Sequence, residues 1–253
     1  MARLVTVVLA ITLVAGLAAG LAAAHIAPSV DDNNRFLKLT PLGDRVRLAY
    51  TILFGDNPGH GKRPGLDANR DGLVDEAEAQ AFGAKLAVDV AEALDVDVDG
   101  KPYPVVWAQV AVGMGSPQTT AGTFSVDLVG YLCLARPRGA HHVQLRDRFR
   151  LTRPGETEVK IEDGPGVAIS RARLGRADDP GLDFRFAGPG GPLAEDGLDL
   201  AFEAGDRAAV AHDGLCAIGD AGGSGHALWI GLGVGGAAAL GVVGILLIRR
   251  RAA

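Results

Sequence analysis

The chain has 253 residues, with 30 acidic and 25 basic side chains and a formal net charge of −5. Arg3 and three arginines near the C-terminus lie in apolar end segments, so the part between them holds 30 acidic and 21 basic residues, a net charge of −9. This balance argues against nucleic acid and anionic lipid head groups as partners, and it suits cations. Two cysteines are too few for a cysteine-based zinc site.

The first 24 residues have the layout of a secretory signal peptide. Arg3 precedes an apolar run, and Ala22 and Ala24 fit the small-residue rule for a cleavage site. Cleavage after Ala24 would start the mature chain at His25, and an uncleaved membrane anchor is the alternative. The sequence therefore predicts that the bulk of the chain is exported.

Two strands are expected where the exported part begins. Residues 36–40 are extended, "PLGD" is a turn, and residues 46–54 alternate between apolar and more polar side chains with the period typical of a strand. The stretch "GDNPGHGKRPG" that follows is rich in glycine and proline, and we expect it to break regular structure.

A helix is expected over residues 76–94. An apolar stripe recurs at steps of three and four residues; it consists of Phe82, Leu86, Val90, Ala93 and Leu94. Asp75 and Glu78 fit a capping box, in which each side chain accepts a hydrogen bond from a free backbone N–H at the start of the helix.

The stretch "LDANRDGLVDEAEAQAF" leads into this helix and has the spacing of a calcium loop. Ca²⁺ takes six to eight oxygen ligands in a 12-residue loop, with side-chain ligands at positions 1, 3, 5, 9 and 12, a glycine at 6 and a backbone carbonyl at 7. Counted from Asp67, the candidate ligands are Asp67, Asn69, Asp71, the carbonyl of Leu73, Asp75 and Glu78, with Gly72 at the turn and Val74 as an apolar anchor.

The loop resembles that of the EF-hand family of calcium-binding proteins at each diagnostic position. An EF-hand also has a helix before its loop, which the preceding glycines and prolines disfavour. The stretch "DVDVDGKPYPVV" repeats the spacing at Asp95, Asp97 and Asp99, but Val106 stands where a glutamate is required. A lone, half-framed loop predicts a structural calcium site and not a sensor. An ordinary acidic turn before a capped helix is the alternative.

The remaining exported sequence predicts short strands divided by Gly, Pro and Asp turns. The candidates lie in "LDVDVDGKPYPVVWAQVAV", "TFSVDLVGYLCLA", "HHVQLRDRFRL", "ETEVKIE", "GVAISRARL", "LDFRFAG" and "LDLAFEAG". The expected fold class is mainly β, an antiparallel β-sandwich-like domain over residues 25–215 with one inserted EF-hand-like loop and helix. Asp147, on a strand, is expected to face solvent.

The C-terminal part predicts a membrane anchor. A Gly-rich linker at 216–226 leads to residues 227–248, which carry no charge and are long enough for a transmembrane helix. A basic tail at 249–253 follows, and such clusters stay in the cytoplasm. We therefore expect a single-pass protein of a bacterial cell membrane with most of its chain outside the cytoplasm. A buried helix of a soluble domain and a bacterial sorting signal are the alternatives.

Other candidate residues give weaker signals. Cys133 and Cys216 can pair outside the cytoplasm, and two unpaired thiols are the alternative. The six histidines are His25, His60, His141, His142, His212 and His226. Scattered surface histidines are the simpler interpretation, although His25 at a mature N-terminus could chelate copper or nickel. No Gly-x-Ser-x-Gly, His-Glu-x-x-His or P-loop motif occurs outside the apolar ends, so we expect no enzyme and assign no catalytic residue.

Residues 24–160 resemble a group of bacterial exported, single-pass membrane proteins. The similarity lies in "AAHIAPS", "DRVRLAYTI", the loop with its helix, and the V-D-G-K-P turn at 98–102. Such proteins often accompany nickel or cobalt permeases. The first hypothesis is a membrane-anchored calcium-binding protein with a structural or accessory role, with Ca²⁺ as its cofactor. The alternative implied by the resemblance is an accessory protein of a permease that handles transition metal through exported histidines.

Overall fold

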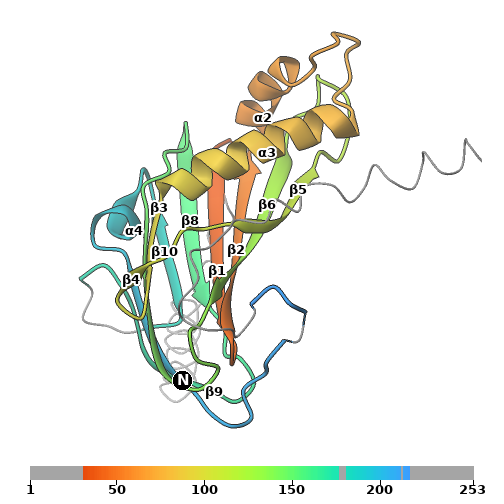
Figure 1. Ribbon diagram of the computed structural model, residues 1–253. Helices are drawn as coiled ribbons and strands as arrows, with labels where there is room; N and C mark the ends of the chain where they lie inside the picture. Colours follow the sequence, from red (N-terminus) through yellow and green to blue (C-terminus); the bar gives the residue numbers. More distant parts are fainter. Residues whose placement is uncertain (1–30, 177–180, 212, 217–253) are drawn as a thin grey trace, which may run out of the picture. The chain divides into compact units, whose positions relative to one another are not determined.

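The computed structural model describes residues 31–176, 181–211 and 213–216 (Figure 1). The predicted signal peptide, nearly all of the linker and the apolar segment 227–248 lie outside these residues. Within them, no helix is both long and apolar enough to cross a membrane. All described residues belong to one compact unit of the chain.

The described domain is mainly β, as expected, and its strands form two sheets. The strands are β1 (Asn33–Pro41), β2 (Arg45–Phe54), β3 (Leu94–Val98), β4 (Lys101–Pro102), β5 (Trp107–Gly113), β6 (Phe124–Cys133), β7 (Gly139–Asp147), β8 (Pro154–Ile161), β9 (Val167–Leu174), β10 (Asp183–Ala187) and β11 (Leu198–Ala204). One sheet has the order β10-β8-β1-β2-β6-β5 and the other β4-β3-β7-β11-β9. Neighbouring strands are antiparallel except for the parallel pair β1–β8.

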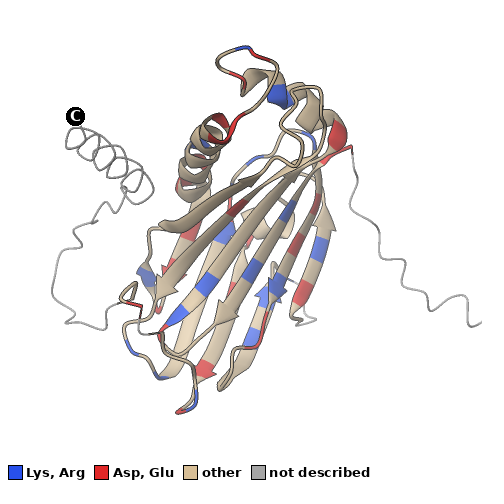
Figure 2. Cartoon of the chain, turned by 90° about the vertical axis from the view of Figure 1, so that its right-hand side faces the viewer, with Lys and Arg blue, Asp and Glu red and all other residues tan. Residues whose placement is uncertain are grey.

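Alternation of side chains along the strands builds one core between the sheets. Inward-facing residues of β1, β2 and β6 are buried while their neighbours are half-buried, which is the period-two pattern of a sheet with one covered face. Leu48 and Leu128 of the six-stranded sheet belong to the same hydrophobic core as Leu145 and Phe202 of the five-stranded sheet. Basic and acidic residues occur along many of the strands (Figure 2).

The "DG" turn is present, but the strand that follows it is shorter than the sequence predicts. Asp99 and Gly100 both have positive φ, 53° and 78°, as a two-residue hairpin turn requires. The returning strand β4 has only two residues, and β5 belongs to the other sheet. Pro102 and Pro104 lack the N–H groups that a longer ladder would need.

Our expectation of irregular structure after β2 is wrong. Residues there form helix α2 (Asp56–Lys62) and a 3-10 turn η2 (Arg63–Gly65). Pro58 lies in the first helical turn, where no intrahelical partner for its missing N–H is needed. Gly59 packs directly on Gly122, whose carbonyl oxygen would come within 2.3 Å of an added Cβ. The glycine therefore serves close packing and does not mark a break.

Helix α3 (Glu76–Ala93) forms where the sequence predicts it and packs on β5 (Figure 1). Leu86 and Val90 of the expected stripe are buried, and Phe82 is half-buried. The indole N–H of Trp107 on β5 donates to the carbonyl of Ala87 at 2.9 Å, which attaches the middle of the helix to the sheet. A short helix, α4 (Gly191–Glu195), follows β10 and buries Leu193.

Asp147 does not face solvent, in contrast to our expectation. The inward alternation of β7 extends to this residue, and its carboxylate accepts bonds from Arg35 at 2.5 Å and from the Tyr50 hydroxyl at 2.8 Å. The other oxygen accepts the N–H of Phe149 at 2.8 Å. Burial raises the pKa of the Asp147 carboxyl, and the charge of Arg35 opposes that rise. The three donors make a buried carboxylate tolerable.

Tyr50 gives the domain a pH dependence in alkaline solution. Burial, with the Asp147 carboxylate adding to it, raises the pKa of the Tyr50 hydroxyl well above 10. Above pH 10 the unfolded chain releases this proton while the folded domain keeps it, so the free energy of unfolding falls by about 1.4 kcal/mol per pH unit from this group. Urea unfolding between about pH 9 and pH 11 should show this slope in the native domain and lose it in Tyr50→Phe.

The variant Tyr131→Phe is the matched control, because Tyr131 is only half-buried. It should keep the alkaline slope. Equal slopes in the native domain and in Tyr50→Phe would contradict the assignment.

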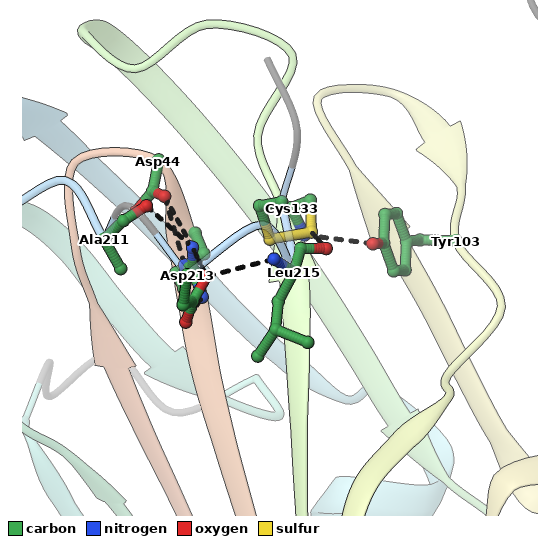
Figure 3. Close-up of polar contacts among 8 residues, drawn as sticks. Asp44, Tyr103, Cys133, Ala211, Asp213 and Leu215 are labelled. Carbon is green, nitrogen blue, oxygen red and sulfur yellow. Dashed lines mark hydrogen bonds and ion pairs between the residues drawn. A yellow bond between two sulfur atoms is a disulfide. The ribbon is translucent and has the colours of Figure 1, made fainter. Parts of the chain in front are cut away.

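A polar cluster and a disulfide fix the last described segment to the sheet (Figure 3). Cys133 at the end of β6 is joined to Cys216, with their Cα atoms 5.4 Å apart, so the first of our two alternatives holds. The buried Arg45 guanidinium bonds Asp44 at 2.8 Å and Asp213 at 2.8 Å, and it reaches the carbonyl of Ala211 at 3.2 Å. These contacts position the chain just before the predicted linker.

Removal of the disulfide should destabilise the domain without changing its sheets. The bond joins residues 83 positions apart and restricts the unfolded chain, and removal of such a native disulfide typically costs about 2–5 kcal/mol. Urea unfolding of the oxidised domain, with and without reductant, should show this loss. The double variant Cys133→Ser/Cys216→Ser should have the same free energy of unfolding as the reduced protein, and reductant should not change it. An oxidised domain no more stable than this variant would contradict the prediction.

Candidate metal centre

The predicted calcium loop lies between η2 and α3, so it has a helix on each side. Our expectation that the incoming helix is missing is therefore wrong. Two residues of the loop have left-handed backbone, Arg70 with φ 63° and Gly72 with φ 87°. Glycine adopts this conformation without steric cost, which is why the turn position of such a loop requires it. The two turns curl the chain back on itself.

The two ends of the loop meet through Glu78. One carboxylate oxygen of Glu78 accepts the N–H groups of Ala68 at 2.8 Å and Asn69 at 3.2 Å. The other oxygen accepts the N–H of Asp75 at 3.1 Å, and Asp75 in turn accepts the N–H of Glu78 at 2.8 Å. The expected capping box is thus present, and the same glutamate closes the loop.

The other predicted ligands point their oxygens into the loop. Asp67 accepts the N–H of Gly72 at 2.9 Å, and Asn69 accepts the N–H of Asp71 at 2.9 Å. Asp71 accepts the N–H of Leu73 at 2.9 Å. Each ionised carboxylate has about four acceptor sites, so these bonds leave acceptor capacity unused.

The side chains are not gathered around one point. In the described part of the chain, no three His, Cys, Asp or Glu side chains form a group that could hold a metal ion. In the loop, the oxygens face backbone N–H groups in place of a common centre. Val74, the expected anchor, is only 2% exposed.

Segment 114–123, between β5 and β6, supports the loop. Val74 donates its N–H to the carbonyl of Pro117 at 2.7 Å, and Thr119 donates both its N–H and its hydroxyl to the carbonyl of Gly72 at 3.0 Å. Leu73 and Gln118 form an isolated antiparallel bridge. One side of the loop is therefore attached to the six-stranded sheet through its connecting segment.

Arg63 of η2 attaches the incoming side to the same segment. Its side chain is fully buried, and its N–H groups donate to five backbone carbonyls: those of Met114 at 2.6 Å, Ser116 at 2.7 Å, Gln118 at 3.3 Å, Gly122 at 2.8 Å and Thr123 at 3.0 Å. A guanidinium has five N–H donors, so each of them has a partner here. Burial lowers the pKa of Arg63, although an arginine stays protonated at any ordinary pH.

Sequence reasoning did not find this support. Arg63 lies in a stretch whose glycines and prolines hide its helical character, and segment 114–123 has no alternation. Gly59 and Gly122 are the one available signal, because a glycine is required wherever two backbones approach closely.

The described histidines have partners of their own. His141 lies on the inner face of β7 with its Nδ1 2.9 Å from Asp99, and His142 points outward with its Nε2 2.7 Å from Asp199. The Nδ1 of His60 lies 3.2 Å from the carbonyl oxygen of Thr120. His25, His212 and His226 lie outside the described residues. Asp95 and Asp97 are strand residues, as expected.

No protein-family model matches the chain, and no curated protein matches it. The likeness to EF-hand loops and to proteins beside nickel or cobalt permeases therefore stays a prediction from the sequence.

Arg63 should matter more to stability than any exposed arginine. The change Arg63→Met keeps an apolar stem but leaves buried carbonyls without donors, which should lower the free energy of unfolding by about 3–5 kcal/mol. Arg63→Lys should recover part of this loss, because an ammonium offers three donors. Urea unfolding followed by circular dichroism measures both.

Arg70→Met is the control, because Arg70 is exposed and its positive φ is equally unfavourable for arginine and for methionine. It should change stability by less than about 0.5 kcal/mol. A loss in Arg63→Met no larger than that would show that the five bonds are unimportant.

Proposed function

We propose that this domain binds one Ca²⁺ in the loop at residues 67–78, where the ion has a structural role. The observation that carries the proposal is that every side-chain oxygen required by the calcium-loop spacing lies in a closed loop, with the position-12 glutamate folded back onto positions 2 and 3. The loop carries four carboxylates, which repel one another in the absence of a cation. An ion would replace that repulsion with attraction.

The attachments of the two flanking helices favour a structural role over a sensor. A sensor opens a groove by moving one helix away from the other. Here the carbonyl bonds of Arg63 and the Trp107–Ala87 bond hold the two sides on the same sheet. Opening would expose these buried polar groups at considerable cost. Calcium would therefore order the loop within a fixed frame.

The finer fold belongs to the same proposal. We describe the domain as a β-sandwich with one EF-hand-like insertion, supported by the shared core of the two sheets and by the helix on each side of the loop. The alternative of nickel or cobalt handling depends above all on His25, outside the described residues. We therefore place calcium first.

Attachment to a bacterial cell membrane is the second part of the proposal. It is supported by the uncharged segment 227–248 and the basic residues after it. A reporter that is active only outside the cytoplasm should be active when fused after residue 226 and silent when fused after residue 253. Activity of the second fusion would contradict this topology.

Calcium binding is tested directly by calorimetry on the domain, residues 25–218. We expect one Ca²⁺ with a dissociation constant on the order of 10⁻⁶ to 10⁻³ M, the range of sensors and of extracellular modules. Glu78→Gln should weaken binding sharply, because it removes a charge and bidentate ligation while a glutamine can still serve a capping box. Calcium should also raise the melting temperature by several degrees, since an ion in hundredfold excess over its Kd contributes about 2.7 kcal/mol.

Glu76→Gln is the matched control, because Glu76 is an exposed glutamate of the same helical turn and is not a predicted ligand. It should bind like the native domain. An absence of heat, or equal affinity in Glu78→Gln and Glu76→Gln, would leave the loop an ordinary acidic turn. A chelator should reverse the thermal shift, while the strand signal in circular dichroism persists at low temperature.

A further inference from the structure

We propose that a groove between α2, η2 and α3 binds a single-chain amphipathic anion, such as a long-chain carboxylate. The groove shares Glu78 with the predicted calcium ligands, but the proposal does not depend on calcium binding. It goes beyond any role inferred above for this domain.

The groove is large and mostly apolar. Its volume is about 790 Å³, within the range of about 300–1,000 Å³ typical of small-molecule sites. The apolar lining comes from β2, the loop entry, α3 and the segment after β7; it consists of Phe54, Leu66, Phe82, Leu86, Phe149 and Leu151. All six of these belong to the main core or pack against it, so the floor of the groove is the side of the core itself.

Three cations line this groove without a carboxylate partner. Lys62, Lys85 and Arg150 are lining residues, and none of them forms an ion pair with another described residue. The Nζ of Lys62 lies 5.1 Å from the ring centroid of Phe82 and 5.6 Å from that of Phe54. Most other arginines on this acidic domain have a partner, for example Arg148 with Asp95 at 3.1 Å. An anion is therefore the ligand whose charge fits.

Two carboxylates also line the groove, and neither cancels this bias. Glu78 is occupied by the N–H groups of the loop. Asp89 is exposed and lies one helical turn from Lys85 on α3, but the three cations outnumber the two carboxylates. The net charge of the lining is thus positive, in a region of the chain that is negative as a whole.

The groove is elongated. One face of α3 lines it from Ala77 to Asp89, which is about 18 Å at 1.5 Å per residue. An extended alkyl chain can lie along this apolar floor, with its anionic end at the cations.

The walls are held in place before any ligand arrives. The carbonyl of Phe149 accepts from Arg35 at 2.7 Å and its N–H donates to Asp147, so the buried ion pair fixes the segment after β7. Trp107 fixes α3 and Arg63 fixes η2. A preformed site needs little ordering of the protein when it binds, which favours affinity.

The test is a fluorescence titration of the domain, residues 25–218, with dansyl-aminoundecanoic acid in the presence of a chelator. The methyl ester of the same probe and a trimethylammonium analogue are run beside it. We expect saturable binding of the carboxylate, and at least tenfold weaker binding of the ester and of the cation. Lys85→Glu/Arg150→Glu should weaken the carboxylate at least tenfold. Ala81→Trp, on the exposed face of α3 that lines the groove, should block it.

Arg207→Glu and Val88→Trp are the matched controls, because both residues are exposed and neither lines the groove. Both should leave the affinity unchanged. Ester and carboxylate binding alike, or groove variants that bind like the controls, would overturn the proposal. A dimer that dissociates only in the Ala81→Trp variant would also overturn it, because the groove would then bind a second copy of the chain. So would binding of a helical acidic peptide that Ala81→Trp abolishes, in a domain that does not bind the carboxylate.

Discussion

The contact on which this end of the domain depends is the insertion of the Arg63 guanidinium among backbone carbonyls. Segment 114–123 cannot satisfy these carbonyls by pairing with a strand, because it connects β5 to β6 across the end of the sheet. Arg63 supplies the donors from a side chain. In return, η2 gains a fixed position, and the loop that follows starts from a defined point. One residue thereby links the sheet to the candidate metal centre.

Buried arginines have the same role at two other places where the chain leaves regular structure. Arg35 ties the segment after β7 to the core through Asp147, and Arg45 ties the last described segment through Asp44 and Asp213. Each guanidinium is buried and has more than one partner. A buried charge without a partner is very costly, so each of these segments has one well-defined position. The sheets supply the hydrophobic core, and the arginines fix its irregular borders.

The sequence could predict features that depend on neighbouring residues, and it could not predict those that depend on contacts between distant residues. Alternation in residues 46–54 and the stripe of α3 are local patterns, and both elements formed where they were expected. The helix at 56–62 was missed because Gly59 serves a contact with Gly122, which is distant in sequence. Asp147 was placed outside because a strand aspartate usually is, whereas its partners Arg35 and Tyr50 lie about a hundred residues away. The disulfide was left open for the same reason.

Glu78 is a predicted calcium ligand from its spacing in the sequence, and the structure adds the hydrogen bonds that it makes. Its spacing from Asp67 is a local pattern, readable without a structure. Its hydrogen bonds reveal a second use, since the same carboxylate caps α3 and closes the loop on the N–H groups of Ala68 and Asn69. A bound cation would compete for these oxygens, whereas Asp75 accepts the N–H of Glu78 with one oxygen and has its other oxygen free for an ion. The helix can therefore persist whether or not an ion is bound. The proposed calcium ion would therefore affect only the order of the loop and the stability that this order contributes.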